Sequence, residues 1–162
     1  MILRAALGDS RAFTLTELLT TLALLGIIAV ISVPVVSNLQ VSSQLDDVTT
    51  EITMSLRAAR SRSVARVDNA THGLSFALTQ GAQSYTIYQI PNDWYVPNTA
   101  FDEVRQIPGA VSISTTLAPA DIYFSRGLGV PNIASTQTIT ITHTSGGSRT
   151  ITITPIGLVD AQ

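Results

Sequence analysis

The sequence predicts an α+β protein in which one long N-terminal helix packs on a small antiparallel β-sheet or sandwich. Three observations lead to this prediction. An apolar run without a charged side chain covers residues 18–36. Apolar residues then recur every three or four positions as far as residue 64, which is the spacing of an amphipathic helix. From about residue 70 apolar and polar residues alternate, as they do in half-buried strands.

The composition of the chain excludes several kinds of chemistry. There is no cysteine among the 162 residues, so disulfides, thiol catalysis and thiolate metal sites are ruled out. All 9 basic side chains are arginines, which excludes a P-loop lysine or a Schiff-base lysine. The net charge of −2 at pH 7 provides no general attraction to nucleic acid or to an acidic membrane surface.

The apolar run is preceded by a short leader that carries Arg4 and Arg11. As a helix the run would be about 28 Å long, close to the ~30 Å hydrocarbon core of a bilayer. Glu17 stands directly before it, and a carboxylate costs roughly 2.5–3.5 kcal/mol at the centre of a membrane. Three interpretations remain: a secretory signal peptide, a plain single-span anchor with Glu17 solvated among the headgroups, and a leader that is removed while the span is kept.

The segment from Ala12 to Leu19, which reads AFTLTELL, resembles the type IV prepilin motif: a small residue, Phe-Thr-Leu, then Glu at the fifth position after the cut. The resemblance implies cleavage between Ala12 and Phe13 by a prepilin peptidase, N-methylation of Phe13, and a pilin-like fold. Two positions differ from the motif. Ala12 stands where Gly is usual, and Thr16 stands where a β-branched apolar residue is usual.

The same resemblance assigns a role to Glu17 in assembly. Its carboxylate would attract the new α-amine of Phe13 on a neighbouring subunit, because opposite charges attract strongly in a low dielectric. Gly26 and Pro34 fall where many pilins have helix-softening residues, which predicts a kink near Pro34. Arg4 and Arg11 orient the leader toward the cytoplasm, so that the C-terminal domain lies outside it.

Beyond Pro34 the apolar stripe predicts that the helix continues and packs a globular domain. Asp68-Asn69 is a plausible terminator. We therefore expect a cleaved leader (1–12), a long helix (13–67) that spans the membrane over 13–36, and a β-rich extracytoplasmic domain (68–162). The stripe consists of Val41, Leu45, Val48, Ile52, Leu56, Ala59 and either Ser63 or Val64.

The rest of the chain predicts short strands separated by turns. The clearest pair is Thr138 to His143 and Thr150 to Thr154, joined by Ser145-Gly146-Gly147 as the turn of a hairpin. The Pro- and Asn-rich stretch from Ile90 to Ile107, around Trp94, is expected to be an irregular loop. The other strands are expected around Leu74 to Leu78, Tyr85 to Gln89, Val111 to Ile113, Ile122 to Phe124 and Leu158-Val159.

This arrangement resembles the GspH/FimT family of minor pilins and pseudopilins in three places. The segment LRAARS, from Leu56 to Ser61, is similar to the family's Leu-x-x-Ala-Arg-Ser signature. Tyr123-Phe124 followed by Gly127 is similar to its Phe-x-x-x-Gly element. The strand from Ile151 to Thr154 resembles the family's last strand, although the Gly-Arg-Val that ends it is Gly157-Leu158-Val159 here.

Four arginines fall within ten residues, and such a cluster can contact nucleic-acid phosphates. The alternative is a solvated helix face, since Asp46, Asp47 and Glu51 come one to two turns earlier and suit the helix macrodipole. The four are Arg57, Arg60, Arg62 and Arg66.

Other candidate sites have structural explanations. His72 and His143 have no ligand-type neighbour at metal-site spacing, so we expect structural histidines, no metal and no cofactor. Asp93, Asp102 and Asp121 lack EF-hand spacing and could bind calcium only if folding brought them together.

The sequence therefore predicts a minor pilin-like subunit rather than an enzyme. It would be built into a type II secretion pseudopilus or a type IV pilus from the inner membrane, with other pilin subunits and the prepilin peptidase as partners. Two alternatives remain: a minor pilin that binds DNA during uptake, and a plain single-span protein with an extracytoplasmic β domain.

Overall fold

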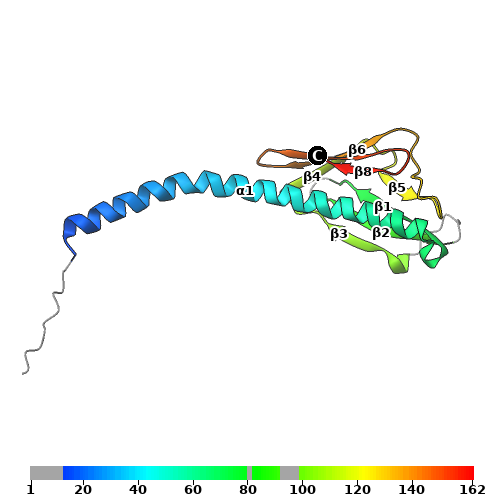
Figure 1. Ribbon diagram of the computed structural model, residues 1–162, viewed down its shortest axis with the longest axis horizontal. Coiled ribbons are helices and arrows are strands. Elements are labelled where there is room, and N and C mark those ends of the chain that lie inside the picture. Colours follow the sequence, from blue (N-terminus) through cyan, green and yellow to red (C-terminus); the bar gives the residue numbers. More distant parts are fainter. Residues whose placement is uncertain (1–12, 80–81, 92–98) are drawn as a thin grey trace, which may run out of the picture. The chain divides into compact units, whose positions relative to one another are not determined.

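The computed structural model describes residues 13–79, 82–91 and 99–162, without the side chains of residues 30–35. Within the chain, residues 1–39 and 40–162 form two compact units, which are treated separately below. Arg4, Arg11, Ala12 and Trp94, all named by the sequence predictions, lie outside the described residues. Figure 1 gives the order of the elements.

The helix α1 runs from Leu15 to Val64 and confirms the predicted long helix. It ends slightly before the predicted Val67, because Arg66 adopts a left-handed φ of 55°, a conformation that commonly terminates helices. A short 3-10 helix, η1 (Val67–Asn69), follows, and Asp68 and Asn69 are also left-handed. The chain therefore leaves the helix before the predicted terminator Asp68-Asn69, which lies in η1. The kink expected at Gly26 and Pro34 stays a prediction.

Among the described residues, eight strands form two antiparallel four-stranded sheets, so the α+β class is confirmed. The order in the first sheet is β3-β2-β1-β5, and in the second it is β4-β6-β7-β8. The strands are β1 (Ala70–Ala77), β2 (Ser84–Pro91), β3 (Glu103–Gln106), β4 (Val111–Thr115), β5 (Asp121–Phe124), β6 (Gln137–His143), β7 (Ser148–Ile153) and β8 (Val159–Ala161).

The interpretation of Ile90 to Ile107 as an irregular loop is wrong in part. Strand β3 and a short 3-10 helix, η2 (Thr99–Phe101), lie within this stretch. Every residue of β3 is exposed, so the strand lacks the alternation of apolar and polar residues by which sequence reveals a strand. Backbone pairing with the edge of β2, for example Arg105 with Tyr85, defines β3 instead.

The hairpin of β6 and β7 confirms the clearest strand prediction. Ile139 pairs with Ile151, and both are fully buried. Gly146 and Gly147 take φ values of 102° and 87° in the connecting turn, which glycine adopts without steric strain. The isoleucines of this hairpin therefore face the core, while threonines such as Thr140 lie on the other, partly exposed face.

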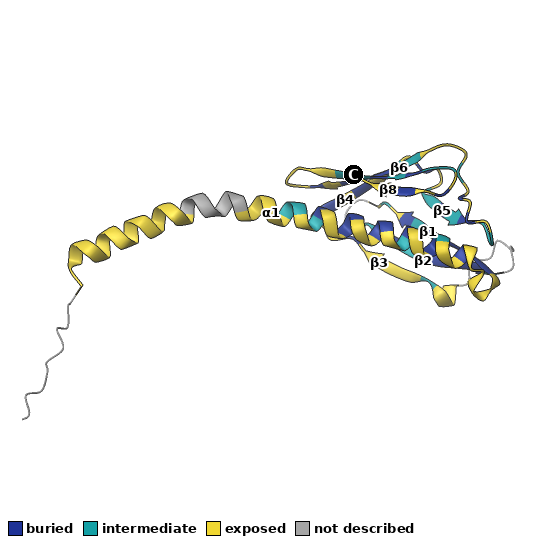
Figure 2. Cartoon of the chain, viewed as in Figure 1, coloured by how far each residue is buried: buried dark blue, intermediate teal, exposed yellow. Residues whose placement is uncertain are grey.

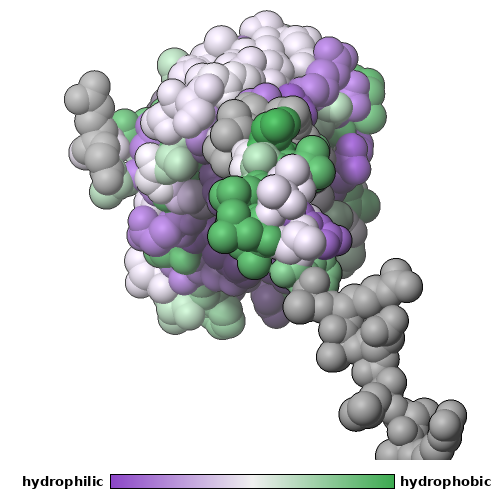
Figure 3. Space-filling view, turned by 90° about the vertical axis from the view of Figure 1, so that its left-hand side faces the viewer, coloured by the Kyte–Doolittle hydropathy of each residue, from purple (hydrophilic) through white to green (hydrophobic). Residues whose placement is uncertain are grey.

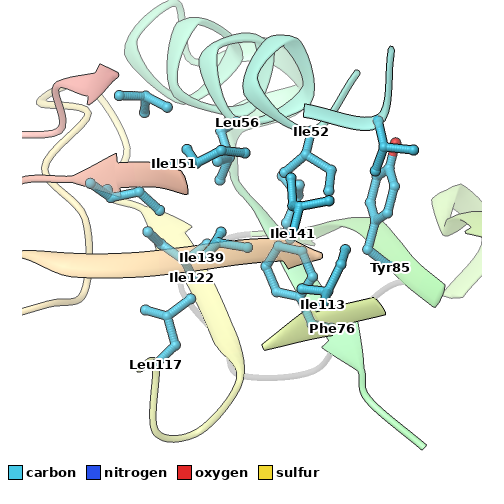
Figure 4. Packing of buried hydrophobic residues seen from close by; sticks show 14 of the residues in the cluster. Ile52, Leu56, Phe76, Tyr85, Ile113, Leu117, Ile122, Ile139, Ile141 and Ile151 are labelled. Atoms are coloured by element: carbon cyan, nitrogen blue, oxygen red, sulfur yellow. The ribbon is translucent and has the colours of Figure 1, made fainter. Parts of the chain in front are cut away.

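One hydrophobic core joins residues 41–64 of α1 to both sheets. The side chains of Ile52 and Leu56 are fully buried, and Figure 4 shows them among isoleucines such as Ile141 and Ile151. The stripe predicted from the sequence is thus the packing face, and Ser63 rather than Val64 continues it. Ser63 is fully buried, whereas Val64 is 47% exposed.

Candidate processing and assembly site

The start of α1 is held by a cap that involves Glu17, the predicted assembly residue. The backbone N–H of Glu17 donates to the carbonyl oxygen of Thr14 at 3.1 Å and to its hydroxyl oxygen at 3.3 Å. Thr-x-x-Glu is the spacing of a capping box, and a carboxylate in the first turn also suits the positive end of the helix dipole. Glu17 therefore has a capping position, which the Thr14–Glu17 spacing signals but which is not among the predictions made from the sequence.

Polar side chains that follow Glu17 are satisfied within the helix itself. The hydroxyls of Thr20 and Thr21 donate to the carbonyl oxygens of Glu17 and Leu18, each at 2.9 Å. Unpaired hydroxyls are costly in an apolar medium. These two threonines therefore place no unpaired donor on the surface of the apolar helix.

Apolar side chains of the first compact unit lie on its surface. All residues from 13 to 29 are exposed (Figure 2). Figure 3 shows hydrophobic surface, coloured green, on the face turned toward the viewer. Exposed apolar area on this scale marks a contact with another protein or with lipid. The large side chains are Phe13, Leu15, Leu18, Leu19, Leu22, Leu24, Leu25, Ile27 and Ile28, between 54% and 77% exposed.

The criteria for a membrane-crossing helix combine length, mean hydropathy and number of charges. Over the described part of the chain, no helix satisfies them.

At the other end of α1, two of the four clustered arginines bind backbone carbonyl groups. Arg57 donates to the carbonyl oxygen of Val159 at 2.9 Å. Arg60 donates to Gly129 at 3.2 Å and to Ile156 at 3.1 Å. These bonds fasten the loop after β5 and the loop between β7 and β8 to the helix.

Glycines make this fastening possible. A Cβ atom on Gly157 would lie 2.8 Å from Nε of Arg60 and 2.8 Å from the carbonyl oxygen of Gly129. Gly127 donates its N–H to the carbonyl oxygen of Ser63 at 2.8 Å. Of the segments that carry the resemblance to GspH/FimT proteins, the one that ends in Gly157 thus meets LRAARS at Arg60, and Gly127 contacts Ser63 and Arg66 further along α1.

The other two arginines of the cluster are differently placed. Arg62 is exposed, and Nε of Arg66 lies 2.9 Å from where a Cβ of Gly127 would be. The predicted contact of Arg57, Arg60, Arg62 and Arg66 with phosphates stays a prediction.

Both histidines have structural hydrogen bonds. His72 is buried, its backbone N–H donates to the hydroxyl of Ser63 at 2.9 Å, and burial lowers its pKa. Nε2 of His143 lies 3.0 Å from the side-chain oxygen of Gln44. Among the residues whose placement is described, no group of three or more His, Cys, Asp and Glu could hold a metal ion.

Comparison with known proteins identifies the N-terminal segment. Residues 8–33 match the family model described as the prokaryotic N-terminal methylation motif. The chain thus carries a type IV pilin-like signal, which points to a structural subunit rather than to an enzyme. No curated protein and no solved structure matches the chain significantly.

Proposed function

We propose that this chain is a minor pilin-like subunit that is cut between Ala12 and Phe13 and then assembled into a filament through its N-terminal helix. The observation that carries the proposal is the methylation motif at residues 8–33, which coincides with a capped helix start and an exposed apolar helix surface. A signal of this kind is read by a prepilin peptidase and is followed by assembly with other pilin subunits.

Van der Waals packing of helix against helix supplies the attraction between subunits in this proposal. Keeping one leucine side chain out of water is worth about 1.5–3 kcal/mol, and the segment from Phe13 to Ile28 exposes nine large apolar side chains. Before assembly the same surface would be covered by lipid, with the chain as a single-span protein of the inner membrane and its β domain outside the cytoplasm. Transfer from lipid to neighbouring helices keeps the surface out of water throughout.

Electrostatic pairing sets the axial position of one subunit relative to its neighbour. Cleavage before Phe13 creates an α-amine four residues from Glu17, and the carboxylate of one subunit can pair with the amine of another. An unpaired charge in an apolar filament interior is strongly unfavourable. Glu17 therefore favours assembly in one axial register.

The β domain would provide specificity as a GspH/FimT-like minor subunit of a type II secretion pseudopilus or a type IV pilus. The close approach of Gly157 to Arg60 of LRAARS, and the hydrogen bond of Gly127 to Ser63, support this assignment. We do not extend the proposal to DNA binding, because Arg57 and Arg60 already donate to backbone carbonyls.

Disulfide crosslinking tests the packing of the helix. The chain has no cysteine, so a Leu25→Cys variant would carry one thiol on the apolar surface, at a side chain that is 62% exposed in the single chain. We expect oxidation of a sheared filament fraction to join this variant to a partner subunit with a cysteine at the equivalent helix depth.

The matched control is Ser145→Cys, at an exposed position of the β6–β7 turn. It should stay uncrosslinked to the same partner under the same oxidant. Equal crosslinking at both positions, or recovery of Leu25→Cys only outside the filament fraction, contradicts the proposed packing.

A further inference from the structure

Five large aliphatic side chains are exposed where Arg60 joins α1 to the two loops that it binds. Four of them flank Gly129 and Gly157, whose backbones approach the side chain of Arg60, and the fifth lies in the last turn of α1. Exposed apolar groups gathered in this way mark an interaction site. The five are Val64, Leu128, Val130, Ile156 and Leu158, between 44% and 75% exposed.

A groove of about 520 Å³ lies beside two of these side chains. Val64 and Leu158 line it together with Arg57 and Arg60. Both arginines donate to backbone carbonyl oxygens, but among the described residues the ion pairs with carboxylates are made by other arginines. The groove thus combines apolar walls with two guanidinium groups that no carboxylate of the described residues neutralises.

The same helix presents complementary groups on another part of its exposed face. Asp47 is exposed and forms no ion pair within the described residues. Met54, which is 63% exposed, lies seven positions later, on the same side of the helix and about 10 Å further along its axis. A methionine side chain is unbranched and adaptable, and so suits insertion into a groove.

The spacing of these two groups matches the spacing of the groups that line the groove. Arg57 and Val64 are also seven positions apart, and they follow Asp47 and Met54 by ten positions each. A parallel second copy of α1, displaced by ten residues or about 15 Å, therefore brings Asp47 to Arg57 and Met54 to Val64 at once. Ten residues make about 2.8 helical turns, so the two rows lie on adjacent sides of the exposed face and leave the buried stripe unused.

We propose that the groove binds a second copy of this chain in parallel orientation, with Met54 of that copy against Val64 and Leu158, and its Asp47 beside Arg57. The inference rests on the proposed function in one respect, because copies anchored in one membrane share the direction of α1. Apolar insertion provides the affinity, since an exposed ion pair contributes little, and the charges set the register. Groove and ridge are different surfaces, so the contact is heterologous and can continue from copy to copy into a filament.

Disulfide crosslinking of the full chain in its native membrane tests this contact. In a Met54→Cys/Val64→Cys chain, oxidation should join copies into a ladder of dimers, trimers and larger species. The two thiols of one copy cannot meet, because about 15 Å of helix separates them and a disulfide requires Cα atoms within about 7 Å. Each single variant should stay monomeric, and so should the matched pair Met54→Cys/Ser145→Cys, whose second thiol lies on the exposed β6–β7 turn.

Charge reversal tests the register. Adding Asp47→Arg to the double-cysteine chain places two guanidinium groups together and should reduce the ladder about tenfold. Adding Arg57→Glu as well restores an opposite pair and should recover most of the ladder. The control is Arg57→Glu without Asp47→Arg, which loses the same bond to Val159 as the restored chain but faces Asp47 with a carboxylate, and should also reduce the ladder.

Four results would each overturn the proposal: no ladder from the double-cysteine chain, an equal ladder from a single variant or from the Ser145→Cys pair, crosslinking to another protein instead of a second copy, and no recovery on double reversal. The contact lies within residues 40–162 and needs neither cleavage nor the amine of Phe13. The ladder is measured in membranes and the Leu25→Cys crosslink in filaments, so the two proposals fail separately.

Discussion

Replacing Glu17 with glutamine should leave the chain in the membrane fraction and reduce its incorporation into filaments about 100-fold or more. Removing one partner of a buried ion pair costs about 3–5 kcal/mol, and each 1.4 kcal/mol is about a factor of ten. Glutamine also occurs at this position of capping boxes, so the helix start is retained while the charge is lost. Quantification of the variant in sheared filaments against the membrane fraction measures the effect.

Thr14→Ala is the matched control, since it removes the hydroxyl that accepts the Glu17 N–H and keeps the carboxylate. Loss of a cap costs roughly 0.5–2 kcal/mol of helix stability, so incorporation should fall only slightly. If Thr14→Ala lost as much incorporation as Glu17→Gln, the capping position of Glu17 would explain its effect, and pairing with a neighbour's amine would not.

Gly73→Ala should destabilise the β domain by about 1–3 kcal/mol or more, the usual cost of overpacking a core. The added Cβ would lie 2.5 Å from the carbonyl oxygen of Ile122 and 2.8 Å from Cβ of Tyr123. Both belong to β5, which pairs with β1 at this point, so the sheet must open to accept the methyl group. Residues 40–162 contain the whole core, and denaturant unfolding of this fragment measures the free energy of unfolding.

Gly109→Ala is the corresponding control, because no heavy atom lies within 4 Å of its Cβ position. Replacing a glycine whose backbone conformation suits alanine usually leaves the stability of the protein unchanged or raises it by about 0.4–1 kcal/mol. Equal stability of the two variants would contradict the close approach of β1 and β5 at Gly73.

The regular spacing of apolar residues along the sequence made the helix and most strands predictable. The stripe from Val41 to Ala59 is the packing face because each of its residues recurs at helical spacing, and the β6–β7 hairpin combines alternating isoleucines with two turn glycines. Strand β3 was not predictable, because all its side chains are exposed and its pairing with β2 depends on long-range backbone hydrogen bonds.

The candidate site was predictable to a different extent at the two ends of α1. The methylation motif is a local pattern, and residues 8–33 match it. The contacts of Arg60 with Gly129 and Ile156 join residues 69 and 96 positions apart, and no local pattern encodes such a pairing. Asp102 and Asp121 likewise line one pocket, although nothing in their sequence spacing predicts that folding brings them together.

The central claim is that the mature chain begins at Phe13 and uses the new terminus in assembly. Intact-mass and N-terminal peptide analysis of the protein purified from its native membrane tests this most directly. We predict a chain that starts with N-methylated Phe13, four residues before an unmodified Glu17. A purified native chain that still begins at Met1 would contradict the claim, since no amine would then exist for a neighbouring carboxylate to bind.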